Sequence, residues 1–93
     1  MRTIWKFKLP IVQFSIDLRM PQAAELLSVQ LSADGIVYVW ALVESDSAIV
    51  RRRMYIVGTG HAAPPEVRSA RHVGTVQDRC FVWHIFDGGE VAR

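Results

Sequence analysis

The stretch Val57-Gly58-Thr59-Gly60-His61 is the one part of this sequence whose residue types suggest chemistry. Two glycines flank a hydroxyl group and an imidazole follows, so the stretch could be a phosphate loop, a catalytic site or the end of a strand. A phosphate loop is disfavoured, because the lysine of a Walker motif is missing and "HAAPP" cannot easily begin the helix of a dinucleotide fingerprint. We therefore interpret the glycines as the bend at the end of a strand.

Three histidines offer a second kind of chemistry, a metal-dependent hydrolase built on His61, His72 and His84. No HxH or HExxH spacing supports such a site, and Cys80 is the only thiol. A nucleophilic site would need a hydroxyl and a carboxylate aimed at an imidazole, which is more than any local motif here provides. We expect no enzyme, no metal site and no cofactor, and keep the hydrolase as an alternative.

The segment "IVRRRMYIVG" carries three arginines in a strand-like pattern. Alternation places Arg51, Arg53 and Tyr55 on one face, where they could bind phosphates or stack on bases. With His61 and Trp40, these residues form the predicted binding surface. A solvated edge strand is the competing interpretation, since charges there discourage aggregation.

Alternation points Arg52 inward, on the opposite face of the same segment. A buried guanidinium needs an acidic partner, so we expect either a bulge at this position or a partner such as Glu44 or Asp46.

β-Strands must position these side chains, because apolar residues alternate with a period of two and no segment has a convincing helical pattern. The alternation of "VQFSIDLRM" is the clearest and puts Val12, Phe14, Ile16, Leu18 and Met20 on one face. The pair 25–32 and 36–44 is a predicted hairpin around Asp34-Gly35. The apolar strand 36–44 is expected to be central, and either covered on both faces or in contact with another subunit. The predicted strands are 3–9, 12–20, 25–32, 36–44, 49–58, 72–78 and 79–87. The expected fold is all-β, a small antiparallel sandwich or partly open barrel of six to seven strands, in a single domain 1–93.

Composition limits the classes of partner. The net charge of +2 is too small to argue for nucleic acid by itself, and no apolar run of about 18 residues could cross a membrane. Three Trp, two Tyr and four Phe are more aromatic side chains than so small a core can hide. Some of them are expected at a protein interface.

Several motifs follow one another along the chain in this order: "TIWKFKLP", "MPQAAELLSVQ", "VWALVE", "YIVGTGH" and "HVGTVQ…FVWHIFD". With them the chain resembles a family of small proteins of unknown function encoded by tailed phages and prophages. It departs from that family where Ala62 and Ala63 precede Pro64 and Pro65. The resemblance implies a phage accessory protein in the cytoplasm of a bacterial host, and it brings no activity or catalytic residue.

The predicted function is stoichiometric binding to a host, defence or phage protein, or self-assembly as a homo-oligomer, without catalysis. A nucleic-acid or nucleotide-binding module built on Arg51, Arg53, Tyr55 and His61 is the first alternative.

Overall fold

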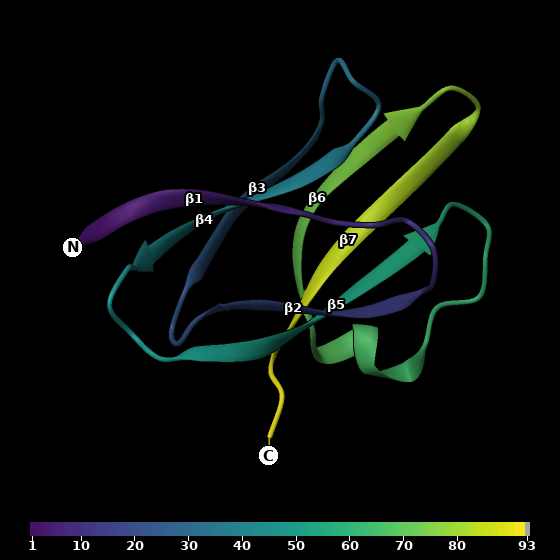
Figure 1. Cartoon of the computed structure of the whole chain (residues 1–93). Helices are drawn as coiled ribbons and strands as arrows, with labels where there is room; N and C mark the ends of the chain where they lie inside the picture. The colour runs from purple at the N-terminus through teal and green to yellow at the C-terminus, as the bar shows by residue number, and fades with distance from the viewer. Residues whose placement is uncertain (93) are drawn as a thin grey trace.

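The computed structural model describes residues 1–92, which form seven β-strands and one short 3-10 helix (Figure 1). The elements are β1 Arg2–Lys8, β2 Ser15–Pro21, β3 Glu25–Leu31, β4 Val37–Glu44, β5 Ile49–Gly58, η1 Pro65–Ser69, β6 Arg71–Asp78 and β7 Phe81–Glu90. They form two antiparallel sheets, one in the order β1-β4-β3 and one in the order β2-β5-β7-β6. The predicted all-β class is therefore confirmed, as an open sandwich and not a closed barrel. The only helix in these 92 residues is far too short to cross a membrane.

The three-stranded sheet is organised around the predicted hairpin of β3 and β4. Gly35 adopts a φ of +83°, the left-handed conformation that such a turn requires, and the Asp34 carboxylate accepts a hydrogen bond from the Ile36 amide at 3.0 Å. One face of β4 is buried and consists of Val37, Val39, Ala41 and Val43. β4 is central, as predicted, but its other face, with Tyr38 and Trp40, is only half-buried by residues 1–92. Contact of this face with another subunit stays a prediction.

The four-stranded sheet has an unusual strand order, because β7 lies between β5 and β6 although it follows both in sequence. Both neighbours pair antiparallel with β7 and so run parallel to each other. The connection between them must therefore cross β7, and it carries η1, which packs against that strand (Figure 1).

The core lies between the sheets, which approach most closely where β3 lies beside β6. Gly74 allows this approach, since a Cβ there would lie 2.8 Å from Cγ1 of Val29. Arginine side chains bond across the seam: Arg71 Nη1 donates to the Leu26 carbonyl at 3.1 Å and Arg52 Nη1 to the Ala24 carbonyl at 2.8 Å. The fully or nearly buried core side chains include Leu9, Met20, Leu26, Val39, Val43, Met54 and Ile85.

Two sequence predictions are corrected at the start of the chain. The second strand begins at Ser15 and not at Val12, so Val12 and Phe14 lie in the β1–β2 connection with 72% and 64% of their surface exposed. The first strand, predicted over 3–9, ends at Lys8; Leu9 beyond it is buried, but Trp5 within it remains 38% exposed. β1 is an edge strand, and its side chains have a neighbouring strand on one side only.

Candidate functional site

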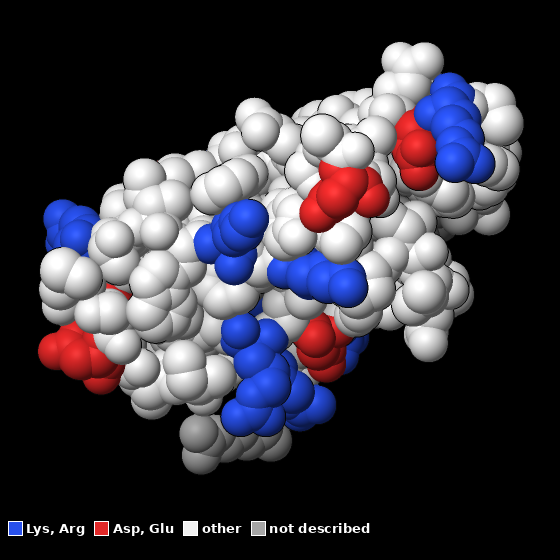
Figure 2. Space-filling model, turned by 45° about the horizontal axis from the view of Figure 1, so that its top comes forward, with Lys and Arg blue, Asp and Glu red and all other residues white. Residues whose placement is uncertain are grey.

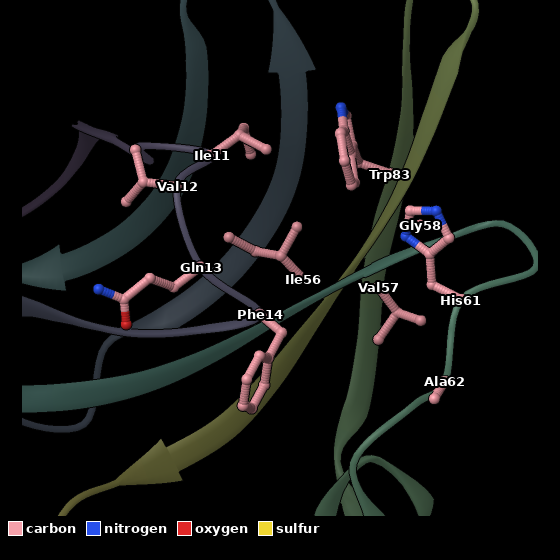
Figure 3. Close-up of a pocket in the computed structure, with 10 residues that line it drawn as sticks. All are labelled: Ile11, Val12, Gln13, Phe14, Ile56, Val57, Gly58, His61, Ala62 and Trp83. Atoms are coloured by element: carbon pink, nitrogen blue, oxygen red, sulfur yellow. The ribbon is translucent and has the colours of Figure 1, made fainter.

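The open end of the sandwich holds an apolar pocket of about 350 Å³. The β1–β2 connection supplies one wall, and the end of β5 with the start of β7 supplies the other. Figure 3 shows Ile11 of the β1–β2 connection on one side of the pocket and Trp83 of β7 on the other, with His61 beside the indole. Such a concave apolar site with few polar groups is typical of a binding surface.

Large apolar side chains surround this pocket on the outside of the molecule. Phe14 is 64% exposed and Phe81 is 52% exposed. The Phe81 ring stacks on Trp83, with centroids 5.6 Å apart and an interplanar angle of 13°. A second cavity of about 440 Å³ adjoins the first and shares Gly58, His61 and Trp83 with it. We call Val12, Phe14, His61, Phe81 and Trp83 together the aromatic end.

The Gly58–His61 stretch has a packing role at this end. The His61 amide donates to the Gly58 carbonyl at 3.0 Å, and Gly60 has a φ of +83°, so the chain turns back on itself. The imidazole then lies on Gly58, where a Cβ would be 2.5 Å from His61 Nδ1 and 3.1 Å from Trp83 Cζ3. His61 and Trp83 meet edge to face, with centroids 6.2 Å apart. The predicted bend at the end of the strand is present, and the glycines make room for the imidazole.

The other two histidines take part in a chain of hydrogen bonds with threonines. His84 Nε2 lies 2.7 Å from Thr59 Oγ1, and its Nδ1 lies 3.0 Å from Thr75 Oγ1. The same Thr75 hydroxyl lies 3.1 Å from His72 Nε2. A hydroxyl beside an imidazole is the start of a nucleophile–base pair. Here the other ring nitrogen of His84 meets the Thr75 hydroxyl, at the place where a catalytic triad has a carboxylate.

The three histidines therefore do not converge on one site. His72 and His84 are joined through Thr75, whereas His61 packs on Trp83. Within residues 1–92 no cluster of three His, Cys, Asp or Glu side chains could hold a metal ion. The Cys80 thiol is exposed and free, and it lines the second cavity.

The arginine strand presents less positive charge than the sequence suggests. Arg53 is hydrogen-bonded to the Asp17 carboxylate, and Arg51 lies 3.6 Å from it. The hydrogen bond from Arg53 lowers the pKa of Asp17, despite some desolvation, and keeps the carboxylate charged. Figure 2 likewise shows acidic groups among the basic groups on one face of the molecule, with broad uncharged areas between them.

Tyr55 is placed on the same face as Arg53 but is only 7% exposed. Its ring lies close to Gly88, where a Cβ would be 2.6 Å from Tyr55 Cε2. A buried ring cannot stack on a nucleic-acid base, so this residue is not available for the role predicted from the sequence.

Arg52 points into the sandwich, as the alternation predicts, and the ladder of β5 with β7 has an irregularity shortly after it, between Arg53 and Met54. Its acidic partner is neither Glu44 nor Asp46. Its guanidinium binds both carboxylate oxygens of Asp87, at 2.9 and 2.8 Å, and Glu90 lies 3.9 Å away. Burial by itself would raise the pKa of Asp87, but the hydrogen bonds from Arg52 and the Gly89 amide outweigh it and lower that pKa. The bond to Asp87 also raises the pKa of Arg52. Glu44 instead pairs with Arg2.

Trp40 lies on the other sheet, apart from the remaining predicted residues. It belongs to the outer face of β4, where the Lys6 ammonium lies 5.8 Å from its ring centroid and 4.5 Å from that of Tyr38. The structure thus places Arg51, Arg53 and Tyr55 together, His61 at the open end and Trp40 on the opposite sheet.

The aromatic end itself was not predicted as a site. Pro10 could have indicated this end of the molecule, because a proline stops the pairing of the first strand. The apolar residues that follow it then lie in a connection and not in a strand. Phe81 follows the turn residue Arg79, whose φ of +58° marks the tight β6–β7 hairpin. Exposed aromatic side chains beside such turns are candidates for a binding surface.

Comparison with family models matches residues 1–92 to a family described as Domain of unknown function (DUF7352). The match agrees with the expectation of a family of unknown function and spans every residue that the structure describes. Searches of curated proteins and of solved structures gave no match.

Proposed function

This chain belongs to the family described as Domain of unknown function (DUF7352), and since that description names no activity, we propose a function from the surface of the chain itself. The protein acts by stoichiometric binding to another protein through the aromatic end. The observation that carries this proposal is the pair Phe14 and Phe81, each more than half exposed beside an apolar pocket.

The energetics of exposed rings support this assignment. A Phe side chain contributes about 1.5–3 kcal/mol when it moves from water into an apolar environment. Exposing two such rings together gives up that stabilisation unless a partner covers them. Aromatic side chains are also enriched at the centres of protein interfaces. The stack of Phe81 on Trp83 holds the ring in place before binding, which lowers the entropic cost of association.

The resemblance of the sequence to small phage proteins supports the choice of partner. We place the protein in the cytoplasm of a bacterial host, with a host, defence or phage protein as the target. Self-assembly through the same surface is the alternative within this class. Nucleic-acid binding has less support, because Tyr55 is buried and Arg51 and Arg53 share Asp17.

The test combines capture of partners with matched surface variants. Phe14→Ser with Phe81→Ser removes both exposed rings of the aromatic end, and Ile49→Ser removes an exposed apolar side chain from another part of the molecule. Tagged proteins are used to capture partners from bacterial lysate, and sedimentation measures self-association. We expect a protein that is held by the wild type and by Ile49→Ser and is lost from the double variant.

Partners that all three proteins retain equally would contradict the proposed surface. Self-association that only the double variant loses would assign the aromatic end to a homo-oligomer. Salt-sensitive binding of oligonucleotides that Arg51→Ala with Arg53→Ala abolishes would favour the nucleic-acid alternative.

A further inference from the structure

A second surface, separate from the aromatic end, is the free edge of β1. This strand ends the three-stranded sheet and pairs only with β4. Leu9 donates its amide hydrogen to the Val37 carbonyl at 2.9 Å, and the Met1 carbonyl accepts one from Ser45 at 2.9 Å. Residues 1 and 9 therefore form hydrogen-bonded pairs with β4. Because such pairs alternate along an antiparallel ladder, the odd-numbered residues of β1 direct their amide and carbonyl groups toward β4.

The even-numbered residues of β1 therefore direct their amide and carbonyl groups away from β4. Arg2, Ile4, Lys6 and Lys8 supply these groups along one edge. Sheet edges in proteins are commonly protected by bulges, proline or charged side chains, which discourage another strand from pairing. Of these β1 has only the charges, which select against a strand of like charge, and its register with β4 is continuous over all seven residues.

Side chains on the two faces of β1 indicate what kind of strand could pair there. The outer face carries Lys6 and Lys8, and neither lies within 4.0 Å of an acidic side chain in the described part of the chain. The inner face carries Trp5 and Phe7, whose rings lie 6.4 Å apart, and Trp5 is 38% exposed. The edge thus offers positive charge on one face and an apolar surface on the other.

A second copy of this chain fits the edge poorly. In a symmetric antiparallel pair centred on Trp5, Lys8 of one copy would lie opposite Arg2 of the other, twice over. Like charges directly opposite each other destabilise a pair of strands. A strand with acidic side chains on one face and apolar side chains on the other complements both faces.

We propose that the free edge of β1 binds an extended acidic segment of a partner protein as a fourth strand of this sheet. Main-chain hydrogen bonds to the even-numbered residues give the affinity, and the alternation of acidic and apolar side chains gives the specificity. The proposal does not depend on the aromatic end, because it uses a different strand and a different chemistry.

The test is a titration of the full chain with synthetic peptides, followed by NMR. The probe peptide alternates Glu and Val over seven residues, and its controls are the same composition with the residues grouped in blocks and an alternating Lys and Val peptide. We expect the alternating acidic peptide to slow hydrogen exchange at the amides of Arg2, Ile4, Lys6 and Lys8. Lys6→Glu with Lys8→Glu should weaken binding about tenfold, because two attractive cross-strand pairs become repulsive.

A backbone variant separates strand pairing from simple charge attraction. Ile4→Pro removes an amide hydrogen that faces the free edge and leaves the bonds to β4 in place. We expect this variant to fold and to lose the peptide. If it does not fold, the lysine variants still test the proposal. Equal binding of all three peptides, binding unaffected by the lysine variants, or chemical-shift changes confined to Phe14 and Phe81 would each overturn it.

Discussion

Arg52 of β5 and Asp87 of β7 form a bidentate ion pair inside the sandwich, with N–O distances of 2.9 and 2.8 Å. The two strands are neighbours in the four-stranded sheet. The same guanidinium donates to the Ala24 carbonyl at 2.8 Å. One side chain therefore connects β5 and β7 with the residue that directly precedes β3. The two sheets share no backbone ladder at this seam, so the guanidinium supplies part of the bonding that a closed barrel would have.

Replacing Arg52 should destabilise the fold strongly. Arg52→Met leaves the Asp87 carboxylate buried without its partner, and we expect the free energy of unfolding to fall by about 3 kcal/mol. Arg2→Met is the matched control, because the Arg2–Glu44 pair is exposed and should contribute less than about 1 kcal/mol. Urea unfolding of both variants measures the difference. Equal losses in the free energy of unfolding would show that the buried Arg52 pair contributes no more than the exposed Arg2 pair.

Acid should destabilise the protein through Asp87. The pKa of this carboxyl is lower in the folded chain than its unfolded value of about 3.9, so the folded state binds fewer protons in this range. The stabilisation is therefore complete well above pH 4 and is lost as the pH falls below it. Urea unfolding between pH 7 and pH 3 should show a smaller loss for Asp87→Asn than for the wild type. Asp17, whose pKa is also lowered, should behave in the same way in Asp17→Asn. Parallel pH profiles for wild type and both variants would contradict this account.

The close approach of β3 and β6 should depend on Gly74. In Gly74→Ala the new Cβ meets Cγ1 of Val29 at 2.8 Å, and overpacking of this kind costs about 1–3 kcal/mol. Val29→Ala removes the atom that clashes but leaves a small cavity. The double variant should therefore lose less stability than the sum of the two single variants. A double-mutant cycle in urea measures this coupling, and strict additivity would mean that the two residues do not meet.

The position of His61 should depend on Gly58. Gly58→Ala places a Cβ 2.5 Å from His61 Nδ1, and the exposed imidazole can swing away more easily than the strand can move. We expect a modest loss of stability together with large NMR shifts for the His61 ring and the Trp83 indole. Gly35→Ala is the control, because its strain lies in a distant turn with no atom within 4 Å of the new Cβ. Unchanged His61 and Trp83 signals in Gly58→Ala would show that the imidazole does not pack on the glycine.

Local features of the fold could be predicted from the sequence because they depend on neighbouring residues. The β3–β4 hairpin follows from Asp34-Gly35 between two apolar runs, and the inward direction of Arg52 follows from the period of two. The partner of Arg52 could not be predicted in this way. Asp87 lies 35 residues away and reaches it only because β7 pairs with β5, a relationship that no local pattern contains.

The candidate site was harder to predict than the fold. Apolar and polar residues alternate from Val12 onward, but β2 begins only at Ser15. An alternating pattern does not show where the pairing with β5 begins. Phe14 was therefore expected to share the apolar face of the strand and is instead exposed. Tyr55 shows the reverse error, since its burial depends on Gly88 of a distant strand. Both cases depend on tertiary packing, which overrides local preference.

The place of β7 between two earlier strands also constrains the order in which the chain can fold. β5 and β6 have no hydrogen-bonding partner in common except β7, which follows both of them along the chain. Their sheet is continuous only when β7 pairs with both of them, and this pairing brings Asp87 to Arg52. Folding must then wait for contacts between residues far apart in sequence, and such topologies fold slowly. The Arg52–Asp87 ion pair can form only once β7 has paired with β5, so the bonding inside the sandwich depends on the last strand of the chain.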